Sequence, residues 1–325
     1  MTPPMITLEE HYLSNSADAL KEFYSEQFKN IPQLAEKMSD VGPLRLGSMD
    51  ENNISVQVVS HCPGAMPVSQ CKSANDELAA AIEANPTRFA GFAVLPVSNP
   101  DASATELRRC IRELGFVGAL IDNRSGDTYY DGPEYEKLWA EAQDLEVPIY
   151  LHPTWPTDKQ KELLYTGAFA ASAALSLGTS GWGWHSDVAL HILRLFAAGT
   201  FDKFPRLKII VGHMGEMLPF MLHRIIQLSP RWGKRNRTFK DVYDTNIWIT
   251  TSGVWSVDPM ATILRNTKID RILYSVDYPF GRNDDGLQFI KELEESGLVT
   301  EEQLKRIAYQ NTEELLGLRV DKTFS

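Results

Sequence analysis

"LKIIVGHMGEMLPFMLHRIIQL" spans residues 207–228 and joins two different patterns without a break. Residues 207–215 open with a short, continuous apolar run, which is typical of a parallel strand buried on both faces of a sheet. Residues 216–228 place their apolar side chains at helical spacing. The stretch therefore predicts one β-strand that is followed directly by one α-helix.

The same strand and helix unit recurs along the chain. Further strands are predicted at 5–11, 55–62, 89–96, 116–122, 147–153, 247–253 and 271–279, and further helices at 73–86, 103–114, 132–145 and 185–199. Eight such units predict an α/β fold of the (β/α)8 TIM barrel type. A closed barrel of eight strands and eight helices typically contains about 250 residues, which this chain can supply. No linker, repeat or low-complexity segment divides the chain. We expect residues 1–325 to form a single barrel domain, with the extra length in long βα loops and C-terminal helices.

Composition narrows the classes of function. The chain has 325 residues, a net charge of −11 and only a local basic segment at 231–237, which disfavours nucleic acid and anionic membranes as partners. No stretch approaches the roughly 18 apolar residues of a membrane span, and no basic segment with a following apolar run opens the chain. Three cysteines form neither a disulfide framework nor a zinc cluster. These features predict a cytoplasmic protein with reduced thiols.

Metal-competent side chains stand at the ends of four predicted strands. Alternation puts Glu9 and His11 on one face of the first strand, and His152, His213 and Asp277 end the fifth, sixth and eighth. In a barrel all of these ends meet at one rim. Each residue alone has a structural alternative, such as a turn aspartate or a hydrogen-bonded histidine, but the recurrence on four strands favours a metal site. Carboxylates and imidazoles without thiolates suit Zn²⁺ or Mn²⁺ and permit Mg²⁺, and such an ion can attract an anionic substrate to an acidic protein.

The segment after the sixth strand adds a possible partner for His213. Glu216 would lie in the first turn of the following helix, where a carboxylate is favoured by the helix dipole. It can orient the imidazole of His213 and raise its basicity, or it can be an ordinary surface residue of that turn. Gly212 and Gly215 would permit close approach of the backbone.

These motifs together resemble the amidohydrolase superfamily and, within it, the nonoxidative aromatic acid decarboxylases, which include gamma-resorcylate, 2,3-dihydroxybenzoate and salicylate decarboxylases and ACMSD-like enzymes. The likeness is carried in the family's order by "LEEH", "VPIYLHP", "IIVGHMGEMLP", "WITTSG" and "RILYSVDYPF". It implies one divalent metal ion held by Glu9, His11, His152 and Asp277, no organic cofactor, and a homodimer or homotetramer. It also implies that His213 and Glu216 are catalytic partners.

Two features favour a decarboxylase over the hydrolases of the superfamily. The first strand carries Glu-x-His rather than the His-x-His of most hydrolases, and "FVGALIDN" (116–123) lacks the lysine that carries a bridging carbamate in two-metal sites. Two departures leave the identity of the acid open. Residues 154–156 are Thr-Trp-Pro where relatives often have Arg-Asn-Pro, and "GWGWHSD" (181–187) replaces a less aromatic, histidine-free stretch. For His185 we expect a surface position at the helix start rather than contact with substrate.

The chemistry follows from the instability of an aryl carbanion, which requires that the ring carbon be protonated before CO₂ leaves. Asp277 is expected to deliver that proton, and His213 with Glu216 to manage charge on an ortho hydroxyl of the substrate. Four aromatic residues in the loops are expected to wall the site, although packing is the more common role for such a residue taken singly: Trp155, Trp182, Trp184 and Phe280.

The sequence thus predicts a metal-dependent carboxy-lyase acting on a small ortho-hydroxy aromatic acid such as salicylate, 6-methylsalicylate, orsellinate or a dihydroxybenzoate. An amide or lactone hydrolase on the same barrel stays open as the alternative, and a noncatalytic binder of small ligands is disfavoured by the full set of metal ligands.

Overall fold

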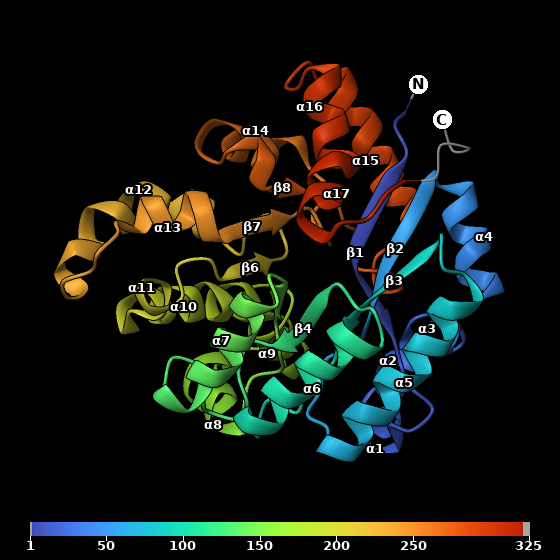
Figure 1. The fold of residues 1–325 in the computed structure, drawn as a ribbon, viewed down its shortest axis with the longest axis horizontal. Coiled ribbons are helices and arrows are strands. Elements are labelled where there is room, and N and C mark those ends of the chain that lie inside the picture. Colours follow the sequence, from blue (N-terminus) through green and yellow to red (C-terminus); the bar gives the residue numbers. More distant parts are fainter. Residues whose placement is uncertain (1, 321–325) are drawn as a thin grey trace.

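Eight parallel strands run in sequence order around one sheet of the computed structural model, which describes residues 2–320 (Figure 1). The strands are β1 (Met5–Tyr12), β2 (Ile54–His61), β3 (Phe89–Ala93), β4 (Gly118–Asp122), β5 (Pro148–His152), β6 (Lys208–Val211), β7 (Ile247–Thr250) and β8 (Ile272–Leu273). Helices follow the strands and surround them, so the predicted (β/α)8 barrel is confirmed. The prediction of a single domain over 1–325 stays a prediction, because residues 1 and 321–325 lie outside the described part.

Helices longer than two turns connect most of the strands. They are α4 (Pro43–Glu51), α5 (Val68–Ala84), α6 (Pro100–Glu113), α7 (Glu136–Asp144), α10 (Gly183–Ala198), α12 (Leu218–Leu228), α13 (Phe239–Asn246), α14 (Val257–Asn266) and α15 (Asn283–Glu295). The predicted helix over 216–228 begins two residues late, because Glu216 and Met217 have left-handed backbone with φ of 51° and 66°. The described residues include no helix long and apolar enough to cross a membrane.

Short helices fill two long βα loops. Between β1 and α4 lie α1 (Asp18–Phe23), α2 (Ser25–Asn30) and α3 (Leu34–Ser39), and between β5 and α10 lie α8 (Asp158–Gln160), the π-helical turn η2 (Lys161–Tyr165) and α9 (Ala171–Gly178). Short elements elsewhere are η1 (Pro133–Tyr135), α11 (Thr200–Lys203), η3 (Ser229–Trp232), η4 (Ile269–Arg271), α16 (Glu301–Lys305), η5 (Arg306–Gln310) and α17 (Asn311–Leu316). These loops were expected to be long, but their helices were not predicted.

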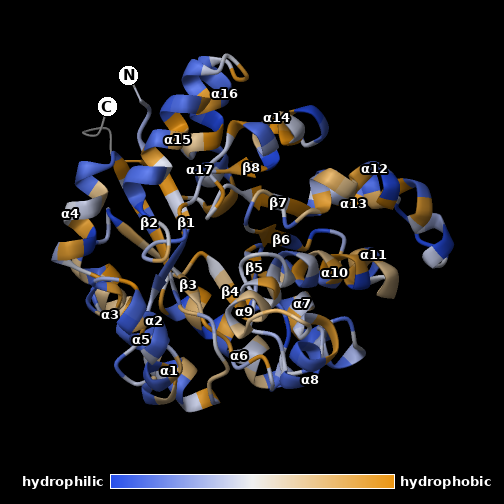
Figure 2. Cartoon of the chain, turned by 180° about the vertical axis from the view of Figure 1, so that it is seen from behind, coloured by the Kyte–Doolittle hydropathy of each residue, from blue (hydrophilic) through white to orange (hydrophobic). Residues whose placement is uncertain are grey.

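The core has two layers, as a barrel requires. Side chains such as Ile149 and Leu151 pack outward against the helices, whereas Phe92, Tyr150 and Ile210 belong to a separate cluster inside the barrel. Figure 2 shows β6, β7 and β8 in hydrophobic colours, while the surrounding helices mix hydrophobic and hydrophilic residues. The free thiols Cys62, Cys71 and Cys110 are all buried.

The last strand is much shorter than predicted. The apolar run 271–279 suggested a full strand, but only Ile272 and Leu273 pair with β7. The residues that follow leave the ladder and bind side chains of β1 instead. Sequence pattern did not show this difference, because Tyr274, Val276 and Tyr278 continue an alternating apolar pattern beyond Leu273.

Candidate active site

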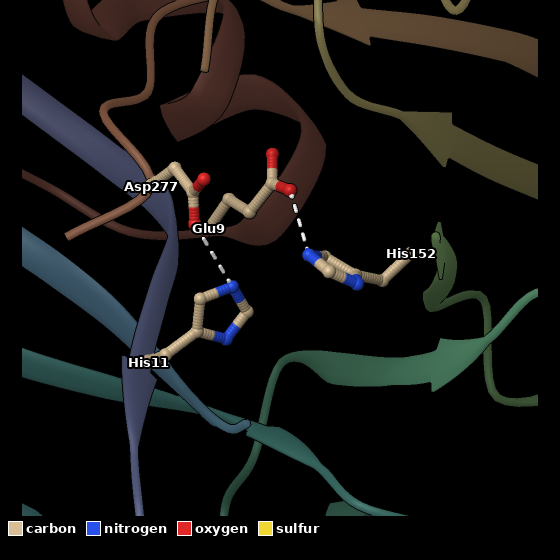
Figure 3. A group of neighbouring side chains, drawn as sticks. All are labelled: Glu9, His11, His152 and Asp277. Atoms are coloured by element: carbon tan, nitrogen blue, oxygen red, sulfur yellow. Dashed lines mark ion pairs between the residues drawn. The ribbon is translucent and has the colours of Figure 1, made fainter. Parts of the chain in front are cut away.

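Four of the predicted metal ligands meet at the C-terminal end of the barrel. Glu9 and His11 come from β1, His152 ends β5, and Asp277 lies in the loop after β8 (Figure 3). One ligand atom of each lies within 4.8 Å of the others. The closest approaches join Nε2 of His11 to Oδ1 of Asp277 and Nε2 of His152 to Oε1 of Glu9, both at 3.2 Å. The structure thus brings together side chains from distant parts of the sequence, since Glu9 and Asp277 are 268 residues apart.

The atoms of this group fit a divalent metal ion. Oε1 of Glu9, Nε2 of His11 and Oδ1 of Asp277 are buried and have no hydrogen-bond partner within residues 2–320. Buried polar atoms are normally bonded, and two carboxylates with two imidazoles that face one point form a common donor set for such ions. Nδ1 of His152 donates to the carbonyl oxygen of Pro153 at 2.6 Å, which leaves Nε2 free to ligate.

The charge states of these groups suit ligation. Burial lowers the pKa of His11, which favours the neutral ring that binds metals. Burial alone would raise the pKa of Glu9, but the neighbouring His213, His152 and His11 lower it well below its usual range. Glu9 is therefore a carboxylate and His11 a neutral imidazole.

A bulge in β1 aims Glu9 into the barrel. The register of β1 against β2 shifts between Thr7 and Glu10, and Oγ of Ser275 accepts hydrogen bonds from two successive amides, those of Leu8 and Glu9. As a result Leu8 and Glu9 both face the interior, so the strict alternation assumed from sequence fails at this point. The bulge puts Glu9 and His11 together on the inner face.

The second oxygen of Glu9 is held by residues that sequence reasoning missed. The hydroxyls of Tyr150 and Ser252 both donate to Oε2 of Glu9, and Tyr150 is also 2.9 Å from Oγ1 of Thr250. Gly212 lies against this group, because a Cβ built on it would stand 2.8 Å from Oε2 of Glu9. Tyr150, Thr250 and Ser252 gave no signal beyond their place in the "VPIYLHP" and "WITTSG" motifs, whereas Gly212 was expected to permit close approach of the backbone.

Glu10 points away from the metal ligands and braces the loop that carries Asp277. Its carboxylate accepts hydrogen bonds from Oγ of Ser275 and from the amides of Val276 and Tyr278, at 3.0–3.1 Å. Asp277 stands between the two bonded amides, with a left-handed φ of 72°. Glu10 thereby fixes a strained turn, a role that its place between Glu9 and His11 did not indicate.

His213 and Glu216 form the predicted pair beside the metal ligands. Nδ1 of His213 lies 2.7 Å from Oε1 of the fully buried Glu216, and Nε2 lies 3.8 Å from Oε1 of Glu9. Burial would lower the pKa of His213, but Glu216 and Glu9 raise it to about 10. His185 departs from the expected surface position: its side chain is 20% exposed, and its Nδ1 lies 2.7 Å from Oε2 of Glu216.

A cavity of about 510 Å³ opens above these groups. His152, His213 and Asp277 contribute to its lining, as do three of the aromatic residues predicted as walls: Trp155, Trp184 and Phe280. Trp182 is not among the lining residues, and 52% of its surface is exposed because it precedes α10 on the outside of the loop.

Further lining residues escaped the sequence analysis. Gln27 and Asn30 come from α2, Tyr24 lies between α1 and α2, and Trp255 comes from the loop after β7. The long loops thus supply both apolar rings and hydrogen-bonding groups to the cavity, which is the composition of a site for a small aromatic ligand.

Known proteins are similar to this chain in sequence and in fold. A family model described as amidohydrolase matches residues 50–318. "Decarboxylase orsB" of Emericella nidulans is 54% identical over 330 residues, covering 99% of each chain, and gamma-resorcylate decarboxylase of a Polaromonas species is 35% identical, covering 96% of this chain and 98% of the relative. The crystal structure of a dihydroxybenzoic acid decarboxylase from Polaromonas, with bound manganese and the inhibitor 2-nitroresorcinol, superposes with a TM-score of 0.85 at 33% identity and 97% coverage of both chains. The chain belongs to the amidohydrolase family.

Proposed function

We propose that this protein is a metal-dependent, nonoxidative decarboxylase of ortho-hydroxy aromatic carboxylic acids. The observation that carries the proposal is the set of unpartnered donor atoms on Glu9, His11 and Asp277 at the base of an aromatic-lined cavity. The decarboxylase names of the similar proteins support it.

Glu9, His11, His152 and Asp277 would hold one divalent ion, for which we propose Mn²⁺ or Zn²⁺, with Mg²⁺ also compatible with the donor set. When bound, the ion would supply a Lewis acid and a positive charge for the substrate carboxylate and its ortho oxygen. The manganese in the Polaromonas decarboxylase favours Mn²⁺. No organic cofactor enters the scheme.

The chain's own residues would then move the proton. The Asp277 carboxyl group donates a proton to the ring carbon that carries the carboxylate, and the new C–H bond forms with electrons from the ring. The bond between this carbon and the carboxylate then breaks, its electrons restore the aromatic ring, and CO₂ leaves. Each turnover takes up one proton, which returns to Asp277 from water through the cavity.

His213 and Glu216 would hold charge at the phenolic oxygen. Nε2 of His213 faces Glu9 at the cavity floor, and Glu216 holds the opposite nitrogen of the ring. The ring of His213 is thereby oriented to hold a proton against the phenolic oxygen. Trp155, Trp184 and Phe280 would stack on the substrate and exclude water.

Release of CO₂ tests the proposal. Salicylate, 6-methylsalicylate, orsellinate, 2,3-dihydroxybenzoate and 2,6-dihydroxybenzoate, each labelled with ¹³C at the carboxyl carbon, are incubated with protein that has been chelated and reloaded with Mn²⁺ or Zn²⁺. Labelled CO₂ is expected from at least one acid and only from loaded protein. Loaded protein that released none would refute the proposal, and hydrolysis of an amide or lactone by the same preparation would support the hydrolase instead.

We also propose that the chain forms homodimers or homotetramers. The loop between β5 and α10 exposes several large apolar side chains, of which Leu163 is 76% and Leu164 62% exposed, and it carries no charged residue from Leu163 to Ser186. Sedimentation analysis tests this, and a monomer at micromolar concentration would contradict it. The cytoplasmic location stays a prediction.

A further inference from the structure

The carboxylate of Glu216 is held on both oxygens by histidines from different parts of the chain. His213, in the loop after β6, approaches Oε1 through Nδ1 at 2.7 Å. His185, in the first turn of α10, approaches Oε2 through its own Nδ1, also at 2.7 Å. The two rings lie 4.9 Å apart between centroids. Glu216 is fully buried, so no water competes for its oxygens at the surface.

His185 is also held at its second nitrogen. Nε2 lies 2.9 Å from the carbonyl oxygen of Ser180. Carbonyl and carboxylate oxygens only accept hydrogen bonds, so the ring of His185 donates on both sides in this arrangement. Ser180 and Trp184 line the cavity, whereas His185 does not. His185 therefore stands behind the cavity wall and connects it to Glu216.

These three residues have the composition of a metal site, but their contacts argue against one. Their ligand atoms lie within 4.8 Å of one another, as do those of the Glu9, His11, His152 and Asp277 group. In that first group three buried atoms have no hydrogen-bond partner, whereas in the Glu216 group every nitrogen and oxygen named above is engaged in a hydrogen bond. The arrangement is that of a hydrogen-bonded chain that orders its members.

We propose that His185 is a positioning residue for the reaction. By holding Oε2 of Glu216, it keeps Oε1 directed at Nδ1 of His213, and so keeps Nε2 of His213 directed at the cavity floor. The inference rests on the proposed function of the same site. Without this contact the carboxylate can rotate away from His213, and the ring of His213 loses its fixed orientation. Loss of such an outer hydrogen-bond partner typically lowers activity by about 10–100-fold.

Two substitutions separate this role from a simple loop tether. The side-chain nitrogen of Asn is as many bonds from Cα as Nδ1 of histidine, so His185→Asn can still donate to Glu216 but cannot reach Ser180. The nitrogen of Gln corresponds in the same way to Nε2, so His185→Gln can still donate to Ser180 but not to Glu216. The two variants therefore remove one hydrogen bond each. His223→Asn, at an exposed position of α12, is the matched control.

The proposal expects kcat for CO₂ release to fall about 10–100-fold in His185→Gln and to be largely retained in His185→Asn. KM and the metal content should change little in either variant, since neither touches the four metal ligands. The control variant should behave as wild type. Full kcat in the Gln variant, or an Asn variant as impaired as the Gln variant, would overturn the proposal. The second result would assign His185 to the loop.

A spectroscopic arm keeps the test independent of turnover. In zinc-loaded protein labelled with ¹⁵N-histidine, the ring signals of His213, identified by their loss in His213→Gln, should keep their positions in His185→Asn and shift in His185→Gln. Unchanged His213 signals in the Gln variant would refute the positioning role. If wild-type protein releases no CO₂ from any acid, the proposed function fails. The spectra still report the orientation of His213, so the positioning role of His185 is tested separately.

Discussion

Replacement of Gly212 by alanine tests the packing around Glu9 most directly. A methyl group at this position would stand 2.8 Å from both Oε2 of Glu9 and the hydroxyl of Tyr150, and 3.1 Å from Oγ of Ser252. Favourable contacts of carbon with other heavy atoms begin near ~3.5 Å, so these oxygens must move by about 0.4–0.7 Å. Functional geometries tolerate displacements of about that size at most. Gly212→Ala should therefore disturb the metal site itself.

The magnitude follows from two opposing effects. Overpacking of a buried site lowers the free energy of unfolding by about 1–3 kcal/mol. Alanine also restricts the unfolded chain more than glycine does, which raises the free energy of unfolding by only about 0.4–1 kcal/mol. We expect Gly212→Ala to lower the free energy of unfolding by about 1.3 kcal/mol, the difference between the midpoints of these two ranges. Because Oε1 of Glu9 moves with Oε2, the affinity for the metal should fall about 10–100-fold.

The assay combines urea unfolding with a metal titration of chelated protein followed by elemental analysis. Gly47→Ala is the control, since Gly47 is exposed in α4 and a Cβ there meets no atom within 4 Å. Alanine in a helix interior should raise its stability by about 0.5–1 kcal/mol without changing metal binding. Wild-type metal affinity in Gly212→Ala would show that Glu9 is not held as we describe.

Three further outcomes are expected. His152→Ala should lose most of about one bound metal ion per chain, as elemental analysis would show, and full retention would remove His152 from the ligand set. Asp277→Asn should lower CO₂ release at least ~100-fold while substrate still binds wherever metal is retained, and near wild-type turnover would exclude Asp277 as the proton donor. Burial lowers the pKa of His191 from 6.5 to about 3. As the pH falls below 6.5, His191 therefore becomes protonated in the unfolded chain but stays neutral in the folded one. Stability should drop from pH 6.5 towards pH 3 by up to about 1.4 kcal/mol per pH unit, and urea unfolding of His191→Gln should show a shallower dependence, an equal slope being the contrary result.

The barrel and the grouping of the candidate metal ligands could be predicted because both depend on local rules. Continuous apolar runs gave the strands, and polar residues such as His152 at strand ends stood out against them. Because all strands of a parallel barrel end at one rim, Glu9 and Asp277 could be placed together although no distance between them was known. The confirmed parts of the fold are those in which each strand buries both of its faces.

The features that escaped prediction depend on contacts between distant segments. The β1 bulge needs Ser275 to hold two amides, and no local pattern around Leu8 reveals it. Tyr150 and Ser252 look like ordinary strand residues until Glu9 is placed beside them. Tyr24 enters the cavity from between two helices that are too short to give a periodic signal, and His185 is recognisable only once Glu216 is seen between two rings.

The junction of β1 with β8 has a consequence for the order in which the protein is made. The two strands are not joined by a ladder; instead Ser275 binds the amides of Leu8 and Glu9, and Glu10 binds those of Val276 and Tyr278. During synthesis, Glu9 and Glu10 of the first strand therefore lack these partners until nearly the whole barrel has left the ribosome. A nascent chain interrupted before Ile272 would hold seven strands but neither Asp277 nor the contacts that shape the β1 bulge. The capacity to capture a metal ion would thus appear late and abruptly in translation, and it would distinguish finished chains from unfinished ones.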